Sequence, residues 1–194
     1  MLINLEGIDG CGKSTQSQFL MDKFESGNEK TILLKEPTNG KYGQKLWEML
    51  SGKIEATTEE ILELFVLDRK EHVNQKIKPA LDDGIIVLMD RYYYSTMAYQ
   101  AAAGIDVDRI RRDNEFAPKP DIVLIFDLPA DLAMKRVRSH SVADVFEKEE
   151  HLEKVRKAYL NLEDDSLVRI IDATRTPEVI FDEVWKLVSE VRNG

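Results

Sequence analysis

Five short runs of branched apolar residues, separated by longer amphipathic stretches, are the feature that most constrains the fold of this 194-residue chain. Runs of Ile, Val, Leu and Phe of this length are typical of strands covered on both faces, which occur in parallel sheets. Their alternation with helices predicts βα units wound around one sheet. The predicted strands are Leu2–Leu5, Thr31–Leu34, Ile85–Asp90, Ile122–Asp127 and Val168–Asp172.

The stretches between these runs have helical periodicity. In the longest of them, Ile61, Leu64, Phe65 and Val73 recur at roughly helical spacing, and Thr58 is a candidate N-cap. No repeat, low-complexity segment or linker divides the chain, so one domain over residues 1–194 is expected. The predicted helices are Ser14–Phe24, Thr57–Leu81, Ser95–Ala103, Asp106–Phe116, Asp131–Arg138, Phe146–Leu162 and Pro177–Val191.

Composition excludes several classes of protein. One cysteine cannot form an internal disulfide, and no Cys/His cluster offers a zinc site. No apolar run is long enough for a bilayer and the start lacks a secretory pattern, so a cytoplasmic protein that does not enter a membrane is expected. The net charge of −9 argues against a nucleic-acid partner, which usually requires a basic surplus. A phosphate ligand would therefore need a few focused cations.

A glycine-rich segment joins the first predicted strand to the first predicted helix. Residues Gly7–Ser14 read G-I-D-G-C-G-K-S, which fits the pattern G-x-x-x-x-G-K-[ST]. Glycines let backbone N–H groups wrap a phosphate, and the following helix adds its positive end. Lys13 can bridge outer phosphates, and Ser14 can offer its hydroxyl to Mg²⁺. The segment predicts binding of a nucleoside triphosphate; the alternative is a chance glycine-rich turn. Cys11 is expected to be a small residue that fills a tight turn, and the alternative is a reactive thiol whose modification blocks ATP.

Asp90 and Arg91 follow the third predicted strand. The carboxyl ends of parallel strands face the ligand crevice, so Asp90 is expected near Ser14 and Mg²⁺, with Arg91 aimed at phosphates. The alternative is a salt bridge at a strand end. The chain has no Asn-Lys-x-Asp segment for reading guanine, and its length suits a nucleotide or nucleoside kinase better than a motor ATPase.

Two further regions allow both a functional and a structural interpretation. Phe65, Arg69 and His72 share one helix face, where Phe65 and Arg69 could hold a base and a phosphate or form ordinary packed and solvated positions. His72 is expected to have a structural role. Arg136 and Arg138 precede a predicted loop at 139–144, and they are either cations on a flap over a triphosphate or partners of a helix dipole.

Six segments together resemble the thymidylate (dTMP) kinases over nearly the full length of the chain. The resemblance implies a P-loop NTPase fold of nucleoside monophosphate kinase type, an α/β fold whose five-stranded parallel sheet is flanked by helices, with a short lid at about 136–148. It also implies transfer of the γ-phosphate of ATP to dTMP in dTTP biosynthesis, Mg²⁺ as cofactor, and a homodimer through the long helices. The segments are LINLEGIDGCGKSTQ at the start, KEPTNGKYG at 35–43 (most similar to archaeal members), LFVLDRKEH at 64–72, DRYYYSTMAYQ at 90–100, PKPDIVLIFDLP at 118–129 and IDATRTPEVI at 171–180.

The resemblance further implies roles for individual residues. Phe65 is expected to stack on thymine, Arg69 to hydrogen-bond the base or the dTMP edge, and Tyr99 to exclude a 2′-hydroxyl. The implied catalytic residues are Lys13, Arg91, Asp9 and Arg138, and the implied Mg²⁺ ligands are Ser14 and Asp90, partly through water. The implied ATP-binding residues are Gly7, Ile8, Asp9, Gly10, Cys11, Gly12, Lys13, Ser14, Thr15, Arg136 and Thr174. The implied dTMP-binding residues are Asp9, Pro37, Phe65, Arg69, Arg91, Thr96, Tyr99 and Gln100.

Two positions depart from the common patterns of this family. Gly10 leaves the phosphate loop without an arginine, which moves the catalytic cation to the lid, where Arg138 is the predicted choice. Lys35 stands where many bacterial members have arginine, which weakens a bidentate phosphate contact there. The remaining alternatives are another nucleoside monophosphate kinase (UMP/CMP-type, or acting on both dTMP and dUMP), a deoxynucleoside kinase, and a nucleotide-binding switch without an acceptor.

Overall fold

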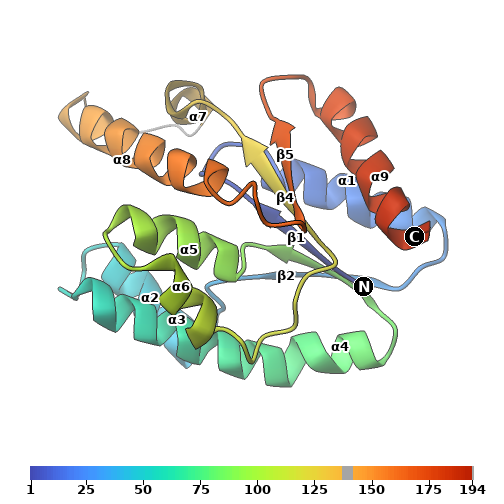
Figure 1. Cartoon of the computed structure of the whole chain (residues 1–194), viewed down its shortest axis with the longest axis horizontal. Coiled ribbons are helices and arrows are strands. Elements are labelled where there is room, and N and C mark those ends of the chain that lie inside the picture. Colours follow the sequence, from blue (N-terminus) through green and yellow to red (C-terminus); the bar gives the residue numbers. More distant parts are fainter. Residues whose placement is uncertain (137–141, 194) are drawn as a thin grey trace.

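A five-stranded parallel sheet forms the centre of the molecule, in the order β2-β3-β1-β4-β5 (Figure 1). The computed structural model describes residues 1–136 and 142–193, with the backbone alone for 142–148. All five predicted strands are confirmed, with ends that move by at most one residue. They are β1 (Leu2–Glu6), β2 (Thr31–Lys35), β3 (Ile86–Asp90), β4 (Ile122–Asp127) and β5 (Val168–Asp172).

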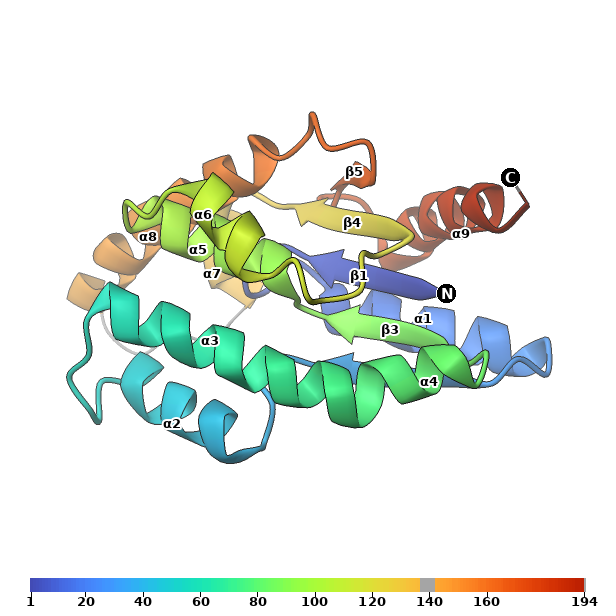
Figure 2. The same cartoon turned by 60° about the horizontal axis from the view of Figure 1, so that its bottom comes forward.

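Helices cover both faces of this sheet, as the predicted α/β fold requires (Figures 1 and 2). Helix α1 packs on β1, β2 and β3 with α9 beside it, while α4 contacts β3 on the opposite face and α5 packs on α8. The helical elements are α1 (Lys13–Ser26), α2 (Lys41–Leu50), α3 (Thr58–His72), η1 (Val73–Ile77), α4 (Lys78–Asp82), α5 (Tyr93–Ala102), α6 (Val107–Asp113), α7 (Ala130–Arg136), α8 (Val142–Leu160) and α9 (Pro177–Asn193).

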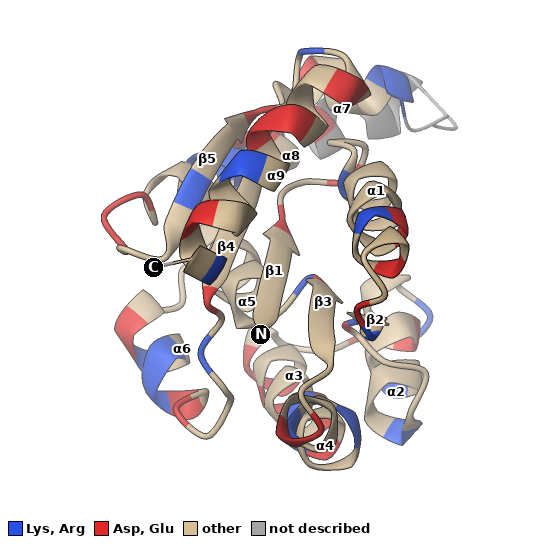
Figure 3. Ribbon diagram, turned by 90° about the vertical axis from the view of Figure 1, so that its right-hand side faces the viewer, with Lys and Arg blue, Asp and Glu red and all other residues tan. Residues whose placement is uncertain are grey.

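The core lies between the layers and is mainly apolar. Strands β1, β3 and β4 are buried along nearly their whole length. Figure 3 shows charges of both signs interleaved on the outer helices, while β1 and β3 carry them only at their ends. No helix among the described residues is both long and apolar enough to cross a membrane.

The predicted helix Thr57–Leu81 is one continuous rod in space but is interrupted in its hydrogen bonding (Figure 2). The cap is Thr57 rather than Thr58, because Thr57 and Glu60 form a reciprocal capping box. Between α3 and α4 the chain widens into the π-turn η1, where the Lys78 N–H donates to Val73 O, five residues earlier. Pro79, which has no N–H to donate, lies just beyond, so a regular α-helical ladder could not have continued through it.

Helix α2 was not predicted. Its N-cap residue, Gly40, supplies no side-chain cap, and the helix contains Gly43, which lowers helix propensity. A Cβ on Gly43 would lie 2.0 Å from Thr38 O, so only glycine allows this close packing. Helix α2 is stabilised by its packing on α3, a tertiary contact that a local pattern does not reveal.

Other helix boundaries also differ from the prediction, by up to four residues. Helix α5 starts at Tyr93 rather than Ser95, and α6 ends at Asp113 rather than Phe116. Helix α8 starts at Val142, four residues before the predicted start at Phe146, so part of the predicted loop at 139–144 is helical.

Candidate active site

Every strand of the sheet ends in an ionisable residue: Glu6, Lys35, Asp90, Asp127 and Asp172. Because the strands are parallel, these ends share one edge of the sheet. The chain runs from β1 to β2 and β3 on one side, and then to β4 and β5 on the other. The end of β1 is therefore the topological switch point, where open α/β sheets bind ligands.

The phosphate loop starts at this switch point, as predicted. Gly7 has φ +135°, and a Cβ there would lie 2.7 Å from Phe126 O and 2.8 Å from Cys11 Sγ. Gly12 is the N-cap of α1 with φ +104° and supplies no side-chain acceptor. Ser14 and Thr15 in the first turn are exposed. The first N–H groups of α1 therefore form an open site for an anion.

Lys13 folds back across the loop. Its Nζ donates to Gly7 O (3.0 Å) and Ile8 O (3.1 Å) and lies 3.7 Å from Cys11 Sγ. Burial, together with the neighbouring charge of Arg91, lowers the pKa of Lys13. Cys11 is only 1% exposed, which fits a small residue filling a tight turn. A phosphate would give the Lys13 ammonium a stronger partner than two carbonyls.

Arg91 connects this loop to the opposite side of the crevice. Its Nη2 donates to Asp9 Oδ1 (2.7 Å) and Tyr99 OH (3.4 Å), and its guanidinium lies over the Tyr99 ring, 5.3 Å from the centroid. Its Nη1 donates to Ser95 Oγ (3.1 Å) and Tyr159 OH (3.4 Å). The predicted catalytic residues Asp9 and Arg91 are thus brought into direct contact.

Asp9 is held ionised by this contact. Partial burial opposes its charge, but the nearby cations Arg91 and Lys13 outweigh that effect and lower the pKa of Asp9. Its side chain is nevertheless 71% exposed, so it remains accessible from the crevice.

Asp90 lies at the end of β3, between Leu5 and Lys35 in the sheet register. Its Oδ2 is 3.5 Å from Lys35 Nζ, whereas its buried Oδ1 has no hydrogen-bond partner among the described residues. A buried carboxylate oxygen without a donor suits a hard cation such as Mg²⁺. No three His, Cys, Asp or Glu side chains of the described ranges converge on a metal site, so phosphate and water would have to complete the coordination of a metal ion.

Arg69, expected to hydrogen-bond the base or the dTMP edge, lies in a buried cluster of polar side chains. Its side chain is 1% exposed and enclosed by Glu36, Asn114 and Thr96. Arg69 Nε donates to Glu36 Oε2 (2.8 Å), Nη1 to Asn114 Oδ1 (2.5 Å) and Nη2 to Thr96 Oγ1 (3.1 Å). His72, whose structural role was expected, places Nδ1 3.1 Å from Glu36 Oε1. Arg69 therefore anchors the wall on the side of the crevice that is expected to bind the phosphate acceptor, dTMP.

Other residues predicted to bind dTMP lie on α3 and α5, the helices that carry Arg69 and its partner Thr96. Thr96 and Gln100 are buried on α5, and the Gln100 Oε1 has no partner among the described residues. Phe65 on α3 and Tyr99 on α5 are only partly buried. A flat apolar face and an unpaired amide oxygen are features that a base could use.

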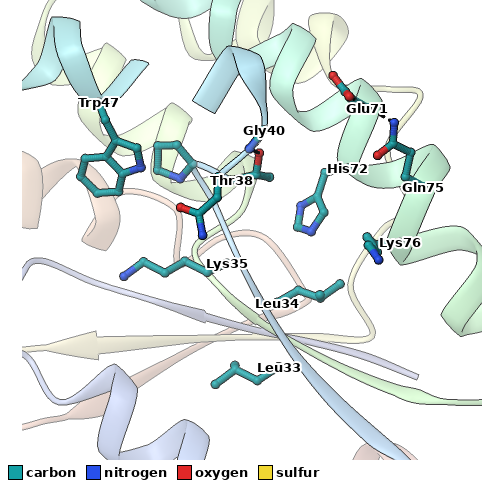
Figure 4. Close-up of a pocket in the computed structure, with 12 residues that line it drawn as sticks. Leu33, Leu34, Lys35, Thr38, Gly40, Trp47, Glu71, His72, Gln75 and Lys76 are labelled. Carbon is teal, nitrogen blue, oxygen red and sulfur yellow. Dashed lines mark hydrogen bonds between the residues drawn. The ribbon is translucent and has the colours of Figure 1, made fainter. Parts of the chain in front are cut away.

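Of the residues predicted to bind dTMP, only Pro37 lines a hollow of about 640 Å³, which lies beside the edge strand β2 (Figure 4). Lys35 and Trp47 border the hollow on one side and His72 and Lys76 on the other (Figure 4). It is the outer side of the 36–40 loop, whose inner residue Glu36 holds Arg69.

Arg136 and Thr174, both implied to bind ATP, lie on segments that the structure brings together. Arg136, exposed at the end of α7, donates from Nη2 to Ala173 O (3.2 Å). The adjacent Thr174 donates from its backbone N and its Oγ1 to Asp172 Oδ1. Arg138 and most of the predicted lid at 136–148 lie outside the residues whose side chains are described, so the role of Arg138 stays a prediction.

Four buried polar residues of the site were missed. Glu6 and Glu36 are 0% and 2% exposed, and each binds several donors beside a predicted cation. Tyr159 and Asn114 complete the shells of Arg91 and Arg69. A signal did exist for the two carboxylates, because each is a charged residue at or just after the end of an apolar strand.

Comparisons with known proteins agree with this geometry. A family model described as thymidylate kinase matches residues 5–184. A probable thymidylate kinase of Archaeoglobus fulgidus is 41% identical over 194 residues, covering 100% of this chain and 97% of the relative. One of Thermococcus kodakarensis is 40% identical over 200 residues and 97% of each chain. A thymidylate kinase of Desulfotalea psychrophila is 46% identical over 163 residues, which is 83% of this chain and 81% of the relative.

Proposed function

The chain belongs to the thymidylate kinase family, and we propose that its reaction is divided between the phosphate loop and the cluster around Arg91. The reaction is transfer of the γ-phosphate of ATP to dTMP, which yields dTDP and ADP. The observation that carries this division is the 2.7 Å contact between Asp9 of the donor loop and Arg91 of the acceptor side. It joins the two halves where the transferred phosphoryl group would pass.

On the donor side, the loop amides and the start of α1 would bind the triphosphate. Lys13 would leave the carbonyls of Gly7 and Ile8 to bridge the outer phosphates. Arg136 and Thr174 would border adenine, since their segments already touch. These groups stabilise charge as it develops, which is most of what phosphoryl transfer asks of a protein.

On the acceptor side, Arg91 would hold the phosphate of dTMP beside Asp9. Phe65 would stack on thymine, with Thr96 and Gln100 at its polar edge and Pro37 nearby. Tyr99, which lies against the Arg91 guanidinium, is suited to exclude a 2′-hydroxyl. Since a phosphate oxygen is already a good nucleophile near neutral pH, no general base is required.

Mg²⁺ is the cofactor that these residues fit. Ser14 and Asp90 would hold it, directly or through water, because they offer a hydroxyl and an unpaired carboxylate oxygen. When bound, the ion neutralises phosphate charge and orients the triphosphate.

A homodimer is supported by the distribution of exposed apolar side chains. Among the described residues, four of the six exposed large apolar side chains lie on α2, the segment after it and α3, and α2 packs on α3: Trp47, Leu50, Ile54 and Leu67. Exposed apolar side chains on neighbouring elements favour a contact surface. Light scattering should give twice the chain mass. Trp47→Glu should lower the measured mass, whereas Val179→Glu on α9 should leave it unchanged.

A cytoplasmic location is supported by the buried free thiol of Cys11, which suits a reducing compartment.

The activity is tested by a coupled assay of ADP release with an acceptor panel. ATP and Mg²⁺ are supplied with dTMP, dUMP, UMP, CMP or thymidine in turn. The proposal expects the highest kcat/KM with dTMP. Preference for UMP or CMP would contradict it, as would release of ADP that does not depend on any acceptor.

A further inference from the structure

Glu6 is the most completely enclosed charged group of the crevice, and it does not itself touch the open site. It is 0% exposed at the end of β1, directly before the phosphate loop. Four donors surround its carboxylate. Oε1 accepts from Tyr92 N (2.7 Å) and Ser95 N (3.2 Å), and Oε2 accepts from Ser95 Oγ (2.5 Å) and Tyr159 OH (2.9 Å).

These four bonds fill the acceptor positions of an ionised carboxylate. Burial raises the pKa of Glu6, while the Ser95 hydrogen bond, the charge of Arg91 and the Tyr159 hydrogen bond oppose that rise. A protonated Glu6 would give up one acceptor position and leave a buried donor without its partner. The surrounding donors therefore suit the charged form.

The two hydroxyls that Glu6 binds are the same two that Arg91 uses. Arg91 Nη1 donates to Ser95 Oγ and to Tyr159 OH. A hydroxyl has one hydrogen, so a hydroxyl that donates to Glu6 must present its lone pairs elsewhere. Glu6 thus turns two oxygen acceptors toward Nη1 of Arg91, which constrains the orientation of its guanidinium.

Glu6 also fixes the backbone beneath Arg91. Arg91 has φ +70°, a left-handed conformation that a non-glycine residue rarely adopts. Its N–H donates to Leu5 O (3.0 Å), and the next N–H, that of Tyr92, donates to Glu6 Oε1. The Ser95 N–H at the start of α5 is bound by the same oxygen. One carboxylate therefore holds the turn, the start of α5 and the side-chain partners of Arg91.

We propose that Glu6 is a positioning residue that sets the orientation of Arg91 for the acceptor phosphate, acting through Ser95 and Tyr159. The inference rests on the proposed role of Arg91 in binding the phosphate of dTMP. It assigns Glu6 no contact with either substrate. Loss of its charge should therefore weaken acceptor binding without weakening ATP binding.

The test compares four variants of the full chain: Glu6→Gln, Tyr159→Phe, Tyr94→Phe and Arg91→Lys. Glu6→Gln keeps the shape but places an amide donor toward the two hydroxyls, which turns their hydrogens toward Arg91. Tyr159→Phe removes one hydroxyl and serves if Glu6→Gln does not fold. Tyr94→Phe is the matched control, because Tyr94 is a buried tyrosine on α5 whose hydroxyl donates to Asp165 (2.9 Å) instead.

The measurement is the KM for dTMP and the KM for ATP in the coupled assay, with Tm recorded for each variant. Glu6→Gln should raise the KM for dTMP about 10- to 100-fold, the range expected when a hydrogen bond to a charged group is lost, and Tyr159→Phe by a smaller factor. The KM for ATP should stay within about twofold, and Tyr94→Phe should change neither KM. A lowered Tm with both KM values unchanged, or an equal rise in both, would overturn the role of Glu6. An unchanged KM for dTMP in Arg91→Lys would instead overturn the role of Arg91, and the inference with it.

Discussion

In the phosphate loop the first N–H groups of α1 have no side-chain cap, whereas around Arg69 and Arg91 the polar groups already bind one another. The donor half consists of backbone amides shaped by glycines, with Lys13 bound to loop carbonyls that a phosphate would replace. The acceptor half consists mostly of buried side chains from β1, α3, α5 and α8, together with Glu36, Arg91 and Asn114 from the segments after β2, β3 and α6. One half is completed by its ligand, and the other is organised before its ligand arrives.

The largest expected effect is a loss of stability when a buried ion pair of the acceptor half is broken. Glu36→Gln should lower the free energy of unfolding by about 3–5 kcal/mol, because it leaves the fully buried charge of Arg69 without its counter-ion. Urea unfolding measures this. The matched control is Glu59→Gln, whose partner Arg109 is exposed, and it should give no resolvable change. Equal losses of unfolding free energy in the two variants would show that the buried pair stabilises the protein no more than the exposed pair does.

The next largest effect is a loss of turnover when the cation of the donor half is removed, with the fold left intact. Lys13→Ala should reduce turnover about 10²- to 10³-fold, the usual loss when one group that stabilises developing charge is removed. Its Tm should stay close to that of the parent, because the Lys13 bonds are made to loop carbonyls. Lys135→Ala, which removes an exposed lysine of α7, is the control. Near-normal turnover in folded Lys13→Ala would refute the assignment of the loop.

A third change separates loop shape from loop chemistry. Gly7→Ala should cost about 2–4 kcal/mol, since it adds strain at φ +135° and pushes a methyl against Phe126 O. Gly84→Ala has positive φ (+71°) but no atom within 4 Å of the new Cβ, so it should cost about 1 kcal/mol. Thermal unfolding compares the two. The close contact at Gly7 is unimportant if both variants lose the same stability.

The same contrast explains what the sequence could predict. The strands, the phosphate loop and the contact region of Arg91 follow from local patterns, namely apolar runs, glycine spacing and the parallel sheet. Helix α2 could not be found, because Gly43 disfavours a helix until Thr38 and α3 pack against it. The helix face that carries Arg69 could be predicted, but its enclosure by Asn114, which is 45 positions away in the sequence, could not.

The smallest expected effect is the pH dependence of the stability that Asp9 contributes through its contact with Arg91, which links the two halves. Arg91 and Lys13 lower the pKa of Asp9 below its ordinary value of 3.8, so the unfolded chain takes up the proton first as pH falls. The stability that Asp9 contributes should therefore be complete above that value and be lost as pH falls through the lower folded pKa. The Tm of the parent chain minus that of Asp9→Asn should be constant from pH 8 to about 5 and shrink below. A difference that grows on acidification would contradict this.

Amide hydrogen exchange of the free chain tests the contrast between the halves most directly. Without ligand, the amides of Lys13, Ser14 and Thr15 should exchange rapidly, and those of Tyr92 and Ser95, which Glu6 binds, should be protected. ATP with Mg²⁺ should slow the first set strongly, while dTMP should change the second set little. If Tyr92 and Ser95 instead exchange as fast as the loop and slow only when dTMP binds, the acceptor half is organised by its substrate and the account is wrong.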